Sequence, residues 1–395
     1  MPELAHRVRS ISPSETLAIA AKAKALKKQG IDVISLAAGE PDWDMPYEAR
    51  EAAITAVREG NTKYTAASGL PELKELVAEK LTNENKIETT AQNVIITTGA
   101  KYALYEAIQA LVNPDDEVIL IAPYWVSYTE MIKMAGGVPK IIQTSEDDGF
   151  KVDLDTLESA ITARVKGIVL NYPSNPSGVS YSEEELRRIG EMAVKKDIFI
   201  ISDEIYEYFS YERPHVSIAS LSKKIAEQTI TVNGFSKSYA IPGWRVGYAT
   251  GPADIISTMN NIQSHSTSNP NTIAQIAMMT AIKESKKYVD KMIAEFRERR
   301  DFIVDALNAL HGFRCQKPEG AFYVFPNVQY YLGNEVGGEV PTDAVAFSNI
   351  LMDKAHVSVV PGNSFGMQGY IRMSYCESIP RLKEAIARID AILEK

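Results

Sequence analysis

The sequence predicts an α/β fold whose large domain is built on a mostly parallel sheet, with helices covering both faces. Short apolar runs of strand length recur between residues 94 and 249, and segments of helical length and pattern separate most of them. The chain has 395 residues, 45% of them hydrophobic, so it can bury a large core and form a large and a smaller domain. A long helical region after Ser266–Pro270 leads to further strands, which indicates a C-terminal domain of mixed α and β structure.

The N-terminal part is predicted to contain a helix, a strand and two more helices. Residues 14–30 favour a helix, because Ser14 can cap its start, apolar residues recur at near-helical spacing and Gly30 ends the pattern. A short strand over 33–36 follows. The next segment, AAGEPDWDMP, is dense in Gly, Pro and Asp, which is typical of a turn or connector. A helix over 47–59, a loop and a second helix complete this part of the chain.

The central part of the chain supplies the strands of the predicted sheet. They are expected at 94–97, 118–121, 167–170, 198–201, 230–232 and 245–249. In the C-terminal part, the segments GAFYVFP, HVSVVPG and GYIRMSY are predicted to be strands of the smaller domain.

Charge and cysteine content exclude several classes of function. The formal net charge of −9 argues against general binding to nucleic acid or to anionic membranes, so an anionic ligand would need a locally positive pocket. The two cysteines, Cys315 and Cys376, cannot form a disulfide framework, and no Cys/His cluster suggests a metal site. The N-terminus lacks a secretory pattern and no stretch is apolar enough to span a bilayer, so we expect a cytoplasmic protein.

The segment 229–252 carries the strongest chemical signal. A β-branched strand leads into a polar loop with Ser236 and Lys237, and a second strand is expected to open at Trp244, next to Arg245. A lysine that attacks a carbonyl needs a rigid turn, partial burial and neighbouring cations that lower its pKa. A hydroxyl and a guanidinium nearby are suitable ligands for a phosphate. We therefore predict a Schiff base between Lys237 and pyridoxal phosphate; the alternative is an ordinary hairpin with a surface lysine.

Further candidate residues follow the predicted strands, and in open α/β sheets ligands bind beyond the carboxyl ends of strands. Thr98–Lys101 follows one strand and opens a helix, where backbone N–H groups could hold a phosphate. Trp125 could stack on a planar ring, and Asn175 could bond to a phenolate or a carboxylate. Taken singly, each has a common alternative: a strand-to-helix turn, core packing and an Asx-type turn.

Asp203 ends a buried apolar strand, which is costly for a carboxylate unless it is paired. A protonated pyridine nitrogen would be such a partner and would keep the ring cationic, while Tyr206 could donate to the ring oxygen. Arg372 alternates with Ile371 and Met373 on a predicted strand, from which it could fork a carboxylate. A buried structural salt bridge and a surface arginine are the alternatives for Asp203 and Arg372.

Together these residues resemble the fold-type I, class I aminotransferases that use pyridoxal phosphate, and the chain is most similar to their prokaryotic aspartate aminotransferase subgroup. The resemblance runs nearly from end to end. It rests on these segments, in order: AAGEPDWDMP, TKYTAASGLPELKE, ITTGAKYAL, PYWVSY, NYPSNPSG, SDEIYE, SKSYAIPGWRVGY, GAFYV, VVPG and IRMSY.

The resemblance implies a domain division and an assembly. Residues 1–45 would form an N-terminal arm and part of the small domain, residues 46–285 the large cofactor-binding domain, and residues 286–395 the C-terminal small domain. Members of the family are homodimers with active sites at the interface, so we expect the same here, with Tyr64 reaching the phosphate of the other subunit.

The resemblance also implies roles for the cofactor-binding residues. Lys237 would hold the cofactor and shuttle protons, and Asp203 would pair with the pyridine nitrogen. Asn175 and Tyr206 would bind the phenolic oxygen, and Trp125 would stack on the ring. The phosphate-binding group would consist of Gly99, Ala100, Lys101, Ser236 and Arg245, together with Tyr64.

For the substrate, the resemblance implies that Arg372 grips the α-carboxylate, with a backbone contact from Gly39 and further contacts from Trp125 and Asn175. Lys101 and Thr16 would hold the distal carboxylate. The same pair accompanies prephenate aminotransferase activity in some relatives. Phe235 departs from the family pattern, since many relatives carry a small residue there, and it should alter the packing beside Lys237.

The function implied by the resemblance is reversible transfer of the amino group of L-aspartate to 2-oxoglutarate, which gives oxaloacetate and L-glutamate. Conversion of prephenate to arogenate is a further activity to test. The alternatives are an aminotransferase for aromatic or neutral amino acids, a lyase that uses pyridoxal phosphate, and a non-catalytic regulator built on the same fold.

Overall fold

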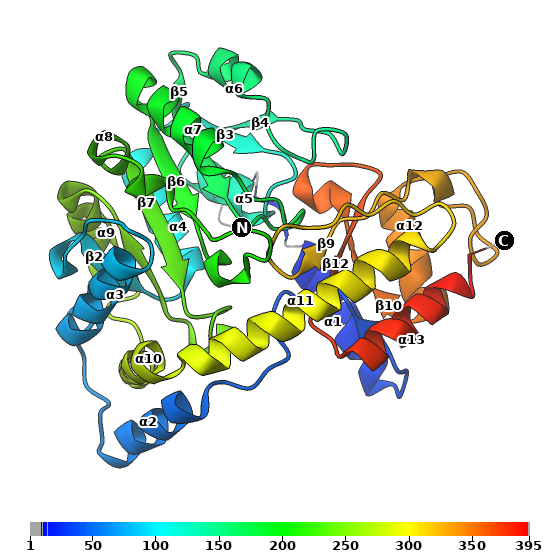
Figure 1. The fold of residues 1–395 in the computed structure, drawn as a ribbon, viewed down its shortest axis with the longest axis horizontal. Helices are drawn as coiled ribbons and strands as arrows, with labels where there is room; N and C mark the ends of the chain where they lie inside the picture. The colour runs from blue at the N-terminus through cyan, green and yellow to red at the C-terminus, as the bar shows by residue number, and fades with distance from the viewer. Residues whose placement is uncertain (1–8, 10, 14, 394–395) are drawn as a thin grey trace, which may run out of the picture.

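The computed structural model describes residues 9, 11–13 and 15–393. Its centre is a seven-stranded sheet with the strand order β2-β8-β7-β6-β5-β3-β4 (Figure 1). The strands are β2 (Val94–Thr97), β3 (Glu117–Ile121), β4 (Val138–Ile142), β5 (Val165–Asn171), β6 (Phe199–Asp203), β7 (Thr229–Gly234) and β8 (Gly247–Thr250). All neighbouring pairs are parallel except those that β8 makes with β2 and β7, so the predicted mostly parallel sheet is confirmed.

Two strands differ from the sequence prediction. The pattern predicts a strand over 245–249 that opens at Trp244, but β8 begins only at Gly247. Arg245 has a left-handed backbone with φ of 57° after a short 3₁₀ turn, Pro242–Trp244, so the chain cannot enter the ladder there. β4 was not predicted, because it is a partly exposed edge strand that contains Pro139.

Helices cover both faces of the sheet because alternate residues of each strand point to opposite sides. Val169 and Ile201 pack in one core cluster with residues of α4, α5 and α9. Their neighbours Ile168 and Ile200 pack in another, with residues of α6, α7 and α8. These helices are α4 (Ala100–Leu111), α5 (Ser127–Met134), α6 (Leu154–Ala160), α7 (Glu183–Lys196), α8 (Lys223–Ala226) and α9 (Ala253–Ser266).

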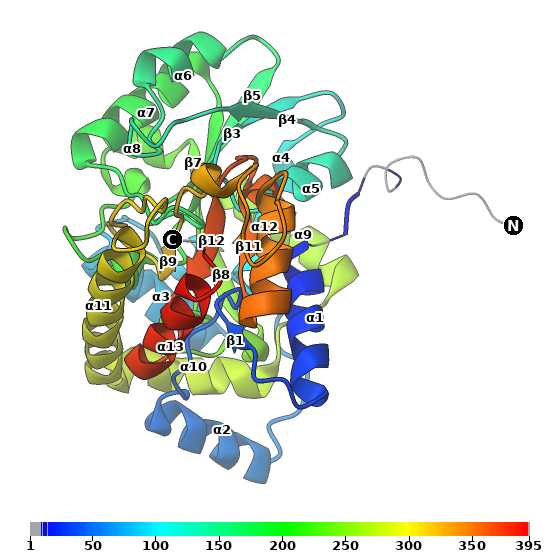
Figure 2. The ribbon, with the colours of Figure 1, turned by 90° about the vertical axis from the view of Figure 1, so that its right-hand side faces the viewer.

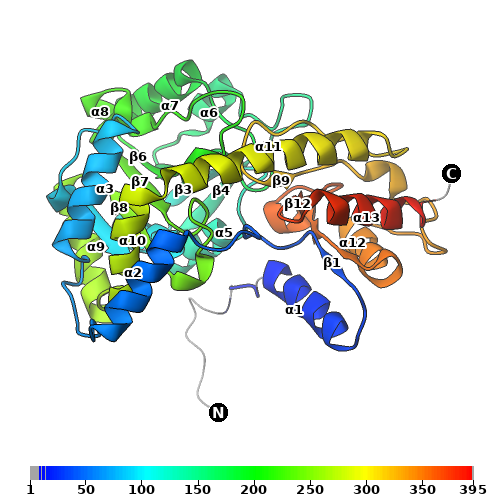
Figure 3. The same cartoon turned by 60° about the horizontal axis from the view of Figure 1, so that its bottom comes forward.

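A third core cluster joins the β2–β8 edge of the sheet to α2 (Tyr47–Arg58), α3 (Pro71–Asn83) and α10 (Thr272–Glu284). Figure 3 shows α2 and α10 side by side, in agreement with their extensive contacts. The helix predicted over 47–59 is confirmed by α2.

Residues near both ends of the chain build the second part of the molecule. β1 (Ile34–Ser35) pairs in parallel with β10 (Val357–Ser358), and β12 (Ile371–Ser374) lies between β11 (Val360–Pro361) and β9 (Tyr323–Val324) in an antiparallel sheet. The helices of this part are α1 (Glu15–Lys28), α12 (Ala344–Ile350) and α13 (Ile379–Asp390), and α11 (Lys286–Asn308) runs from the large sheet towards them (Figures 1 and 2). The domain boundaries expected at 45/46 and 285/286 stay a prediction.

Local predictions in this part are confirmed with shorter bounds. The helix expected over 14–30 is α1, although the proposed cap, Ser14, lies outside the described residues. HVSVVPG forms two strands, β10 and β11, that belong to different sheets. Cys315 and Cys376 are buried free thiols. None of the helices within the described ranges has the length and apolar character needed to cross a bilayer.

Candidate active site

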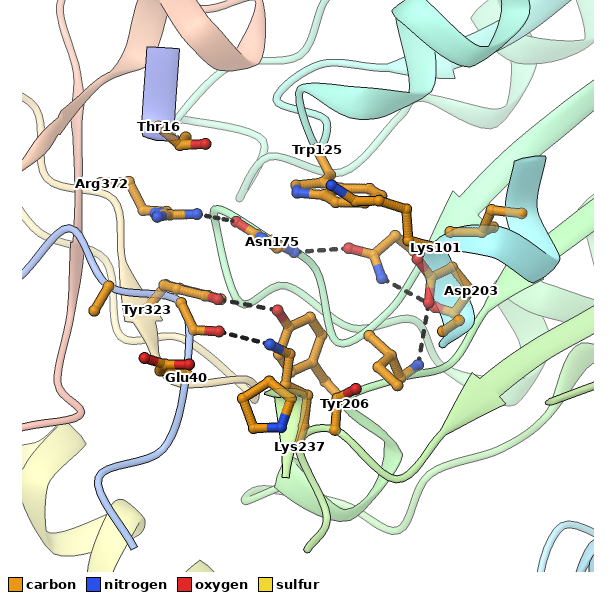
Figure 4. Close-up of a pocket in the computed structure, with 18 of the residues that line it drawn as sticks. Thr16, Glu40, Lys101, Trp125, Asn175, Asp203, Tyr206, Lys237, Tyr323 and Arg372 are labelled. Atoms are coloured by element: carbon orange, nitrogen blue, oxygen red, sulfur yellow. Dashed lines mark hydrogen bonds between the residues drawn. The ribbon is translucent and has the colours of Figure 1, made fainter. Parts of the chain in front are cut away.

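A cavity of about 490 Å³ lies between the carboxyl ends of the parallel strands and the segment that joins β1 to α2 (Figure 4). Its wall contains most of the residues that the sequence singles out: Thr16, Gly39, Ala100, Lys101, Trp125, Asn175, Asp203, Tyr206, Ser236, Lys237, Arg245 and Arg372. Four cationic side chains on this wall face two carboxylates, Glu40 and Asp203. The cavity is therefore locally positive in a chain whose net charge is −9, as anionic ligands require.

Lys237 lies in the turn after β7, and its side chain enters the cavity (Figure 4). Its Nζ donates a hydrogen bond of 2.6 Å to the carbonyl of Gly39. Burial lowers the pKa of Lys237 to about 8; Glu40 opposes this shift, and the cations Arg372 and Arg245 add to it. A surface lysine would show neither feature, so the hairpin alternative does not apply.

Asp203 is the last residue of β6 and is 4% exposed. The hydroxyl of Tyr128 donates to it at 2.6 Å, and the backbone N–H of Ile205 donates at 3.2 Å. Burial raises the pKa of Asp203 to about 6 in spite of these donors. None of the lysines and arginines that the structure describes forms a salt bridge with it, so the structural salt bridge expected as an alternative is absent there.

The start of α4 forms a close cradle with Arg245. Gly99, the residue before α4, has φ of 81°, and a Cβ there would lie 2.6 Å from Nη2 of Arg245. A Cβ on Gly247 would lie 2.2 Å from the backbone nitrogen of Ala100. Gly99 thus lets the guanidinium of Arg245 approach the start of α4, and Gly247 lets β8 approach the same backbone. With Ser236 on the same cavity wall, the cradle combines helix N–H groups, a hydroxyl and a cation, which suit a phosphate.

Arg372 projects from β12 and is 3% exposed. Its Nη1 donates to Oδ1 of Asn175 at 3.0 Å, its Nη2 donates to the carbonyl of Ala37 at 2.8 Å, and the ring of Tyr323 lies 4.5 Å from its Cζ. The buried Nε has no hydrogen-bond partner among the described residues. The surface-arginine alternative is therefore wrong, and the guanidinium is held in one orientation from which it can bind a carboxylate.

Lys101 and Trp125 form a second cationic corner of the cavity. Nζ of Lys101 lies 4.8 Å from the centre of the Trp125 ring, within the range of a cation–π contact. Burial, and then Arg245, lower the pKa of Lys101. Thr16 of α1 lies on the same wall, and Figure 4 shows it on the Arg372 side of Trp125.

The structure adds site residues that the sequence reasoning missed. Tyr128 bonds to Asp203, Asn171 accepts from the backbone N–H of Asn175 at 2.8 Å, and the hydroxyl of Tyr323 lies 3.0 Å from that of Tyr206. Glu40 also lines the cavity. All four lie in the segments PYWVSY, NYPSNPSG, GAFYV and AAGEPDWDMP. These motifs therefore contain the missed residues, but the positions of the residues in the sequence do not show which side chains they contact.

Two predicted positions lie away from the cavity. Tyr64 is 91% exposed, on the loop before α3. Phe235 is buried and packs against Tyr239 and Tyr248 in the core cluster at the β2–β8 edge, with ring centres 5.8 and 5.5 Å away. Phe235 therefore contributes to the core that supports the turn of Lys237 and does not line the cavity.

Comparison with known proteins decides the family. The family described as aminotransferase class I and II matches residues 31–389. The chain belongs to this family.

This aminotransferase is similar over its full length to named relatives. It is 46% identical to the aspartate aminotransferase of Bacillus subtilis (strain 168), over 100% of this chain and 99% of the relative. It is 45% identical to the probable aspartate/prephenate aminotransferase of Aquifex aeolicus (strain VF5), over 99% of both chains. The structure of the Thermus thermophilus aspartate aminotransferase with maleate matches it with a TM-score of 0.93 and 41% identity, covering 100% of both chains.

As a class I aminotransferase, the protein is an enzyme that uses pyridoxal phosphate, and its cavity fits this cofactor. When bound, pyridoxal phosphate supplies an aldehyde that condenses with amines and a pyridine ring that accepts electrons. The cradle of Gly99, Ala100 and Arg245 suits its phosphate. The amine of Lys237 suits its aldehyde, and the buried carboxyl of Asp203, which forms no salt bridge among the described residues, suits a protonated ring nitrogen.

The chain's own residues can perform the acid–base work of an aminotransferase. With a pKa of about 8, Nζ of Lys237 can both accept and return a proton near neutral pH. The carbonyl of Gly39 and the carboxylate of Glu40 lie beside this amine and favour its charged form. Arg372 can orient a carboxylate from one side of the cavity, and Trp125 lies across the cavity from Lys237 (Figure 4).

Proposed function

We propose that the protein is an aspartate aminotransferase, which transfers the amino group of L-aspartate to 2-oxoglutarate and produces oxaloacetate and L-glutamate. The observation that carries this proposal is that one cavity holds two separate cationic positions, Arg372 and Lys101. One suits the α-carboxylate and the other a second carboxylate. Relatives named aspartate aminotransferases support it, as does the maleate, a dicarboxylate, in the Thermus thermophilus structure.

The proposed roles follow the geometry of the wall. Lys237 would be the catalytic amine and Asp203 the partner of the pyridine nitrogen. Tyr206 and Asn175 would bind the phenolic oxygen, and Trp125 would stack on the ring. Thr16 and the backbone of Gly39 would complete the contacts of the dicarboxylate substrate.

Prephenate is a second candidate acceptor. It carries two carboxylates, and relatives named aspartate/prephenate aminotransferases are similar over the whole chain. The deciding experiment is a screen of aspartate, glutamate, phenylalanine, alanine and prephenate, with kcat/KM measured for each. Preference for aspartate and glutamate supports the proposal. Preference for phenylalanine or alanine replaces it with one of the alternatives, and elimination without amino transfer indicates a lyase.

Two substitutions should separate the two carboxylate sites. Arg372→Lys keeps the charge but loses the fork, so we expect KM to rise about tenfold to a hundredfold for aspartate and alanine alike. Lys101→Met should raise KM for aspartate by a similar factor and leave KM for alanine unchanged, because alanine has no distal carboxylate. Steady-state kinetics of both variants with both donors measure this. An equal rise for both donors in Lys101→Met would contradict the assignment of Lys101.

We also propose that the enzyme acts as a cytoplasmic homodimer. Free buried thiols at Cys315 and Cys376 suit a reducing compartment. A tyrosine that is 91% exposed, Tyr64, suits a residue covered by a second copy of the chain.

Tyr64→Phe tests whether the hydroxyl of Tyr64 contacts the cofactor phosphate of the other subunit. We expect a dimer by analytical ultracentrifugation and a cofactor Kd raised about tenfold, because one hydrogen bond to the phosphate is lost. Tyr47→Phe, at another exposed tyrosine, is the control and should leave the Kd unchanged. An unchanged Kd in Tyr64→Phe, or a monomeric wild type, would refute the role of Tyr64.

A further inference from the structure

The segment that joins β1 to α2 forms the side of the cavity that faces Lys237. Within it, Gly39 accepts the hydrogen bond from Nζ of Lys237, and Glu40 follows directly on the cavity wall. A Cβ on Gly39 would lie 2.9 Å from the hydroxyl of Tyr323, so the backbone here is pressed closely against the second part of the molecule. The position of this backbone therefore determines what the amine of Lys237 contacts.

The middle of this segment, at Asp42, is fixed by a buried arginine on α11. Arg299 is 2% exposed, and its Nη1 and Nη2 donate to Oδ1 and Oδ2 of Asp42 at 2.7 and 3.0 Å. Arg299 also bonds to Glu295, one turn earlier on α11. A guanidinium that forks a carboxylate through two parallel bonds fixes both its distance and its orientation. Asp42 can therefore move little relative to α11.

Arginines hold the segment on both sides of Gly39 and Glu40. Before them, Nη2 of Arg372 donates one hydrogen bond to the carbonyl of Ala37 at 2.8 Å, and after them Arg299 holds the carboxylate of Asp42. Next to Asp42, the ring of Trp43 packs edge-on against Tyr288 of α11 at 5.3 Å. Gly39 and Glu40 thus lie on a short stretch of backbone between two arginine anchors.

We propose that Arg299 is a positioning residue for the transfer reaction, which acts through Asp42 to hold the Gly39 carbonyl and the Glu40 carboxylate against the amine of Lys237. Arg299 is outside the cavity wall, so it would contact neither substrate nor cofactor. The inference rests on the proposed function, because it assigns the positioning of the amine that this function uses.

The charges around Lys237 determine in which direction its pKa should change when Arg299 no longer holds Asp42. Glu40 favours its charged form, while Arg372 and Arg245 oppose it, and Asp203 lies across the cavity. Burial raises the pKa of Cys376, so that thiol is neutral where Lys237 titrates. If Gly39 and Glu40 move away, the ammonium loses a hydrogen bond and a nearby carboxylate. The pKa of Lys237 then falls.

The next residue on α11 provides a matched control. Arg300 is also 2% exposed and bonds to the carboxylates of Glu212 and Asp301. None of these three residues lines the cavity. Arg300→Lys should therefore reproduce the loss of a buried guanidinium that is paired with carboxylates on α11, without any change beside Lys237.

The experiment compares Arg299→Lys and Asp42→Asn with Arg300→Lys. The first readout needs no cofactor: apoprotein is acetylated with acetic anhydride across a pH series, and the peptide with Lys237 is quantified by mass spectrometry. We expect the pH at which Lys237 is half-maximally acetylated, the labelling midpoint, to be lower in Arg299→Lys and Asp42→Asn but unchanged in Arg300→Lys. Because Arg299→Lys keeps every charge, a shift in that variant reports geometry.

The second readout is the pH profile of the holoenzyme with aspartate. We expect kcat to fall roughly tenfold or more in Arg299→Lys and Asp42→Asn, with the basic limb of the profile moved in the same direction as the labelling midpoint. In Arg300→Lys, kcat should stay within about twofold of the wild type. Melting temperatures of all variants show whether a substitution destabilises the whole protein. The side chain of Asp42 is 34% exposed, so Asp42→Asn should destabilise the fold less than a substitution of the buried Arg299.

The inference is overturned if the labelling midpoint and kcat in both test variants match those of Arg300→Lys. A wild type that transaminates no amino acid would refute the proposed function instead. The labelling readout still decides whether Arg299 positions the surroundings of Lys237, since it uses neither substrate nor cofactor.

Discussion

Lys237→Ala is expected to abolish transamination and covalent attachment of the cofactor. Nζ of Lys237 enters the cavity and donates to the Gly39 carbonyl, and its pKa of about 8 suits proton transfer near neutral pH. Loss of general acid–base catalysis alone should lower kcat by about 10²-fold to 10⁴-fold. Half-reactions with aspartate measure this rate. Mass spectrometry after borohydride reduction shows whether the cofactor is fixed to the chain.

Lys74→Ala is the matched control, since burial also lowers the pKa of Lys74, which lies on α3 and does not line the cavity. It should keep both the activity and the attached cofactor. Full turnover in Lys237→Ala, or reduction that fixes the cofactor at another lysine of the wild type, would show that the amine has been assigned wrongly.

Asp203→Asn should make the enzyme less active and its apoprotein more stable. Activity should fall about a hundredfold or more, because the amide cannot keep a pyridine nitrogen protonated. Stability should rise, because a carboxylate that is 4% exposed has no cationic partner in the apoprotein other than the nearby Lys237. A site in which activity and stability oppose each other is typical of catalytic groups.

The gain in stability should depend on pH in a defined way. Burial raises the pKa of Asp203 from 3.8 to about 6 in the folded state, so folding favours its protonated form. Its contribution to stability is complete below pH 3.8 and is lost as the pH rises through about 6. Above that pH the wild type should be less stable than Asp203→Asn by an amount on the order of 3 kcal/mol. Urea unfolding of both apoproteins between pH 4 and 8 measures this difference.

Glu106→Gln is the control that separates the gain in stability on removing a buried carboxylate from the loss of activity. Glu106 is fully buried on α4, burial raises its pKa to about 8, and neither carboxyl oxygen has a hydrogen-bond partner among the described residues. It does not line the cavity. Its replacement should raise stability at alkaline pH and leave kcat unchanged. If Asp203→Asn kept full activity, or lost stability above pH 6, the role of Asp203 would have to be abandoned.

The regularity of the chain made much of the fold predictable. Strands β2, β5, β6 and β7 each contain a short, mostly apolar run that is buried on both faces of the sheet, and such runs are visible in a sequence. The sequence pattern does not predict β4, because this edge strand contains Pro139 and shows no such apolar run. Arg245 was placed in a strand because sequence pattern does not show its left-handed backbone, which depends on the turn at Pro242–Trp244.

The sequence by itself determined the α/β class, the lysine that follows β7, the acid that ends β6, and the family. Local patterns carry these features, because strand periodicity and the residues that follow a strand are properties of neighbours in the chain. Only the tertiary structure decided which distant groups touch: Arg372 on Asn175, Lys237 on Gly39, and Arg299 on Asp42. Such contacts depend on how separate elements pack, and packing is a property of the whole fold that no local spacing records.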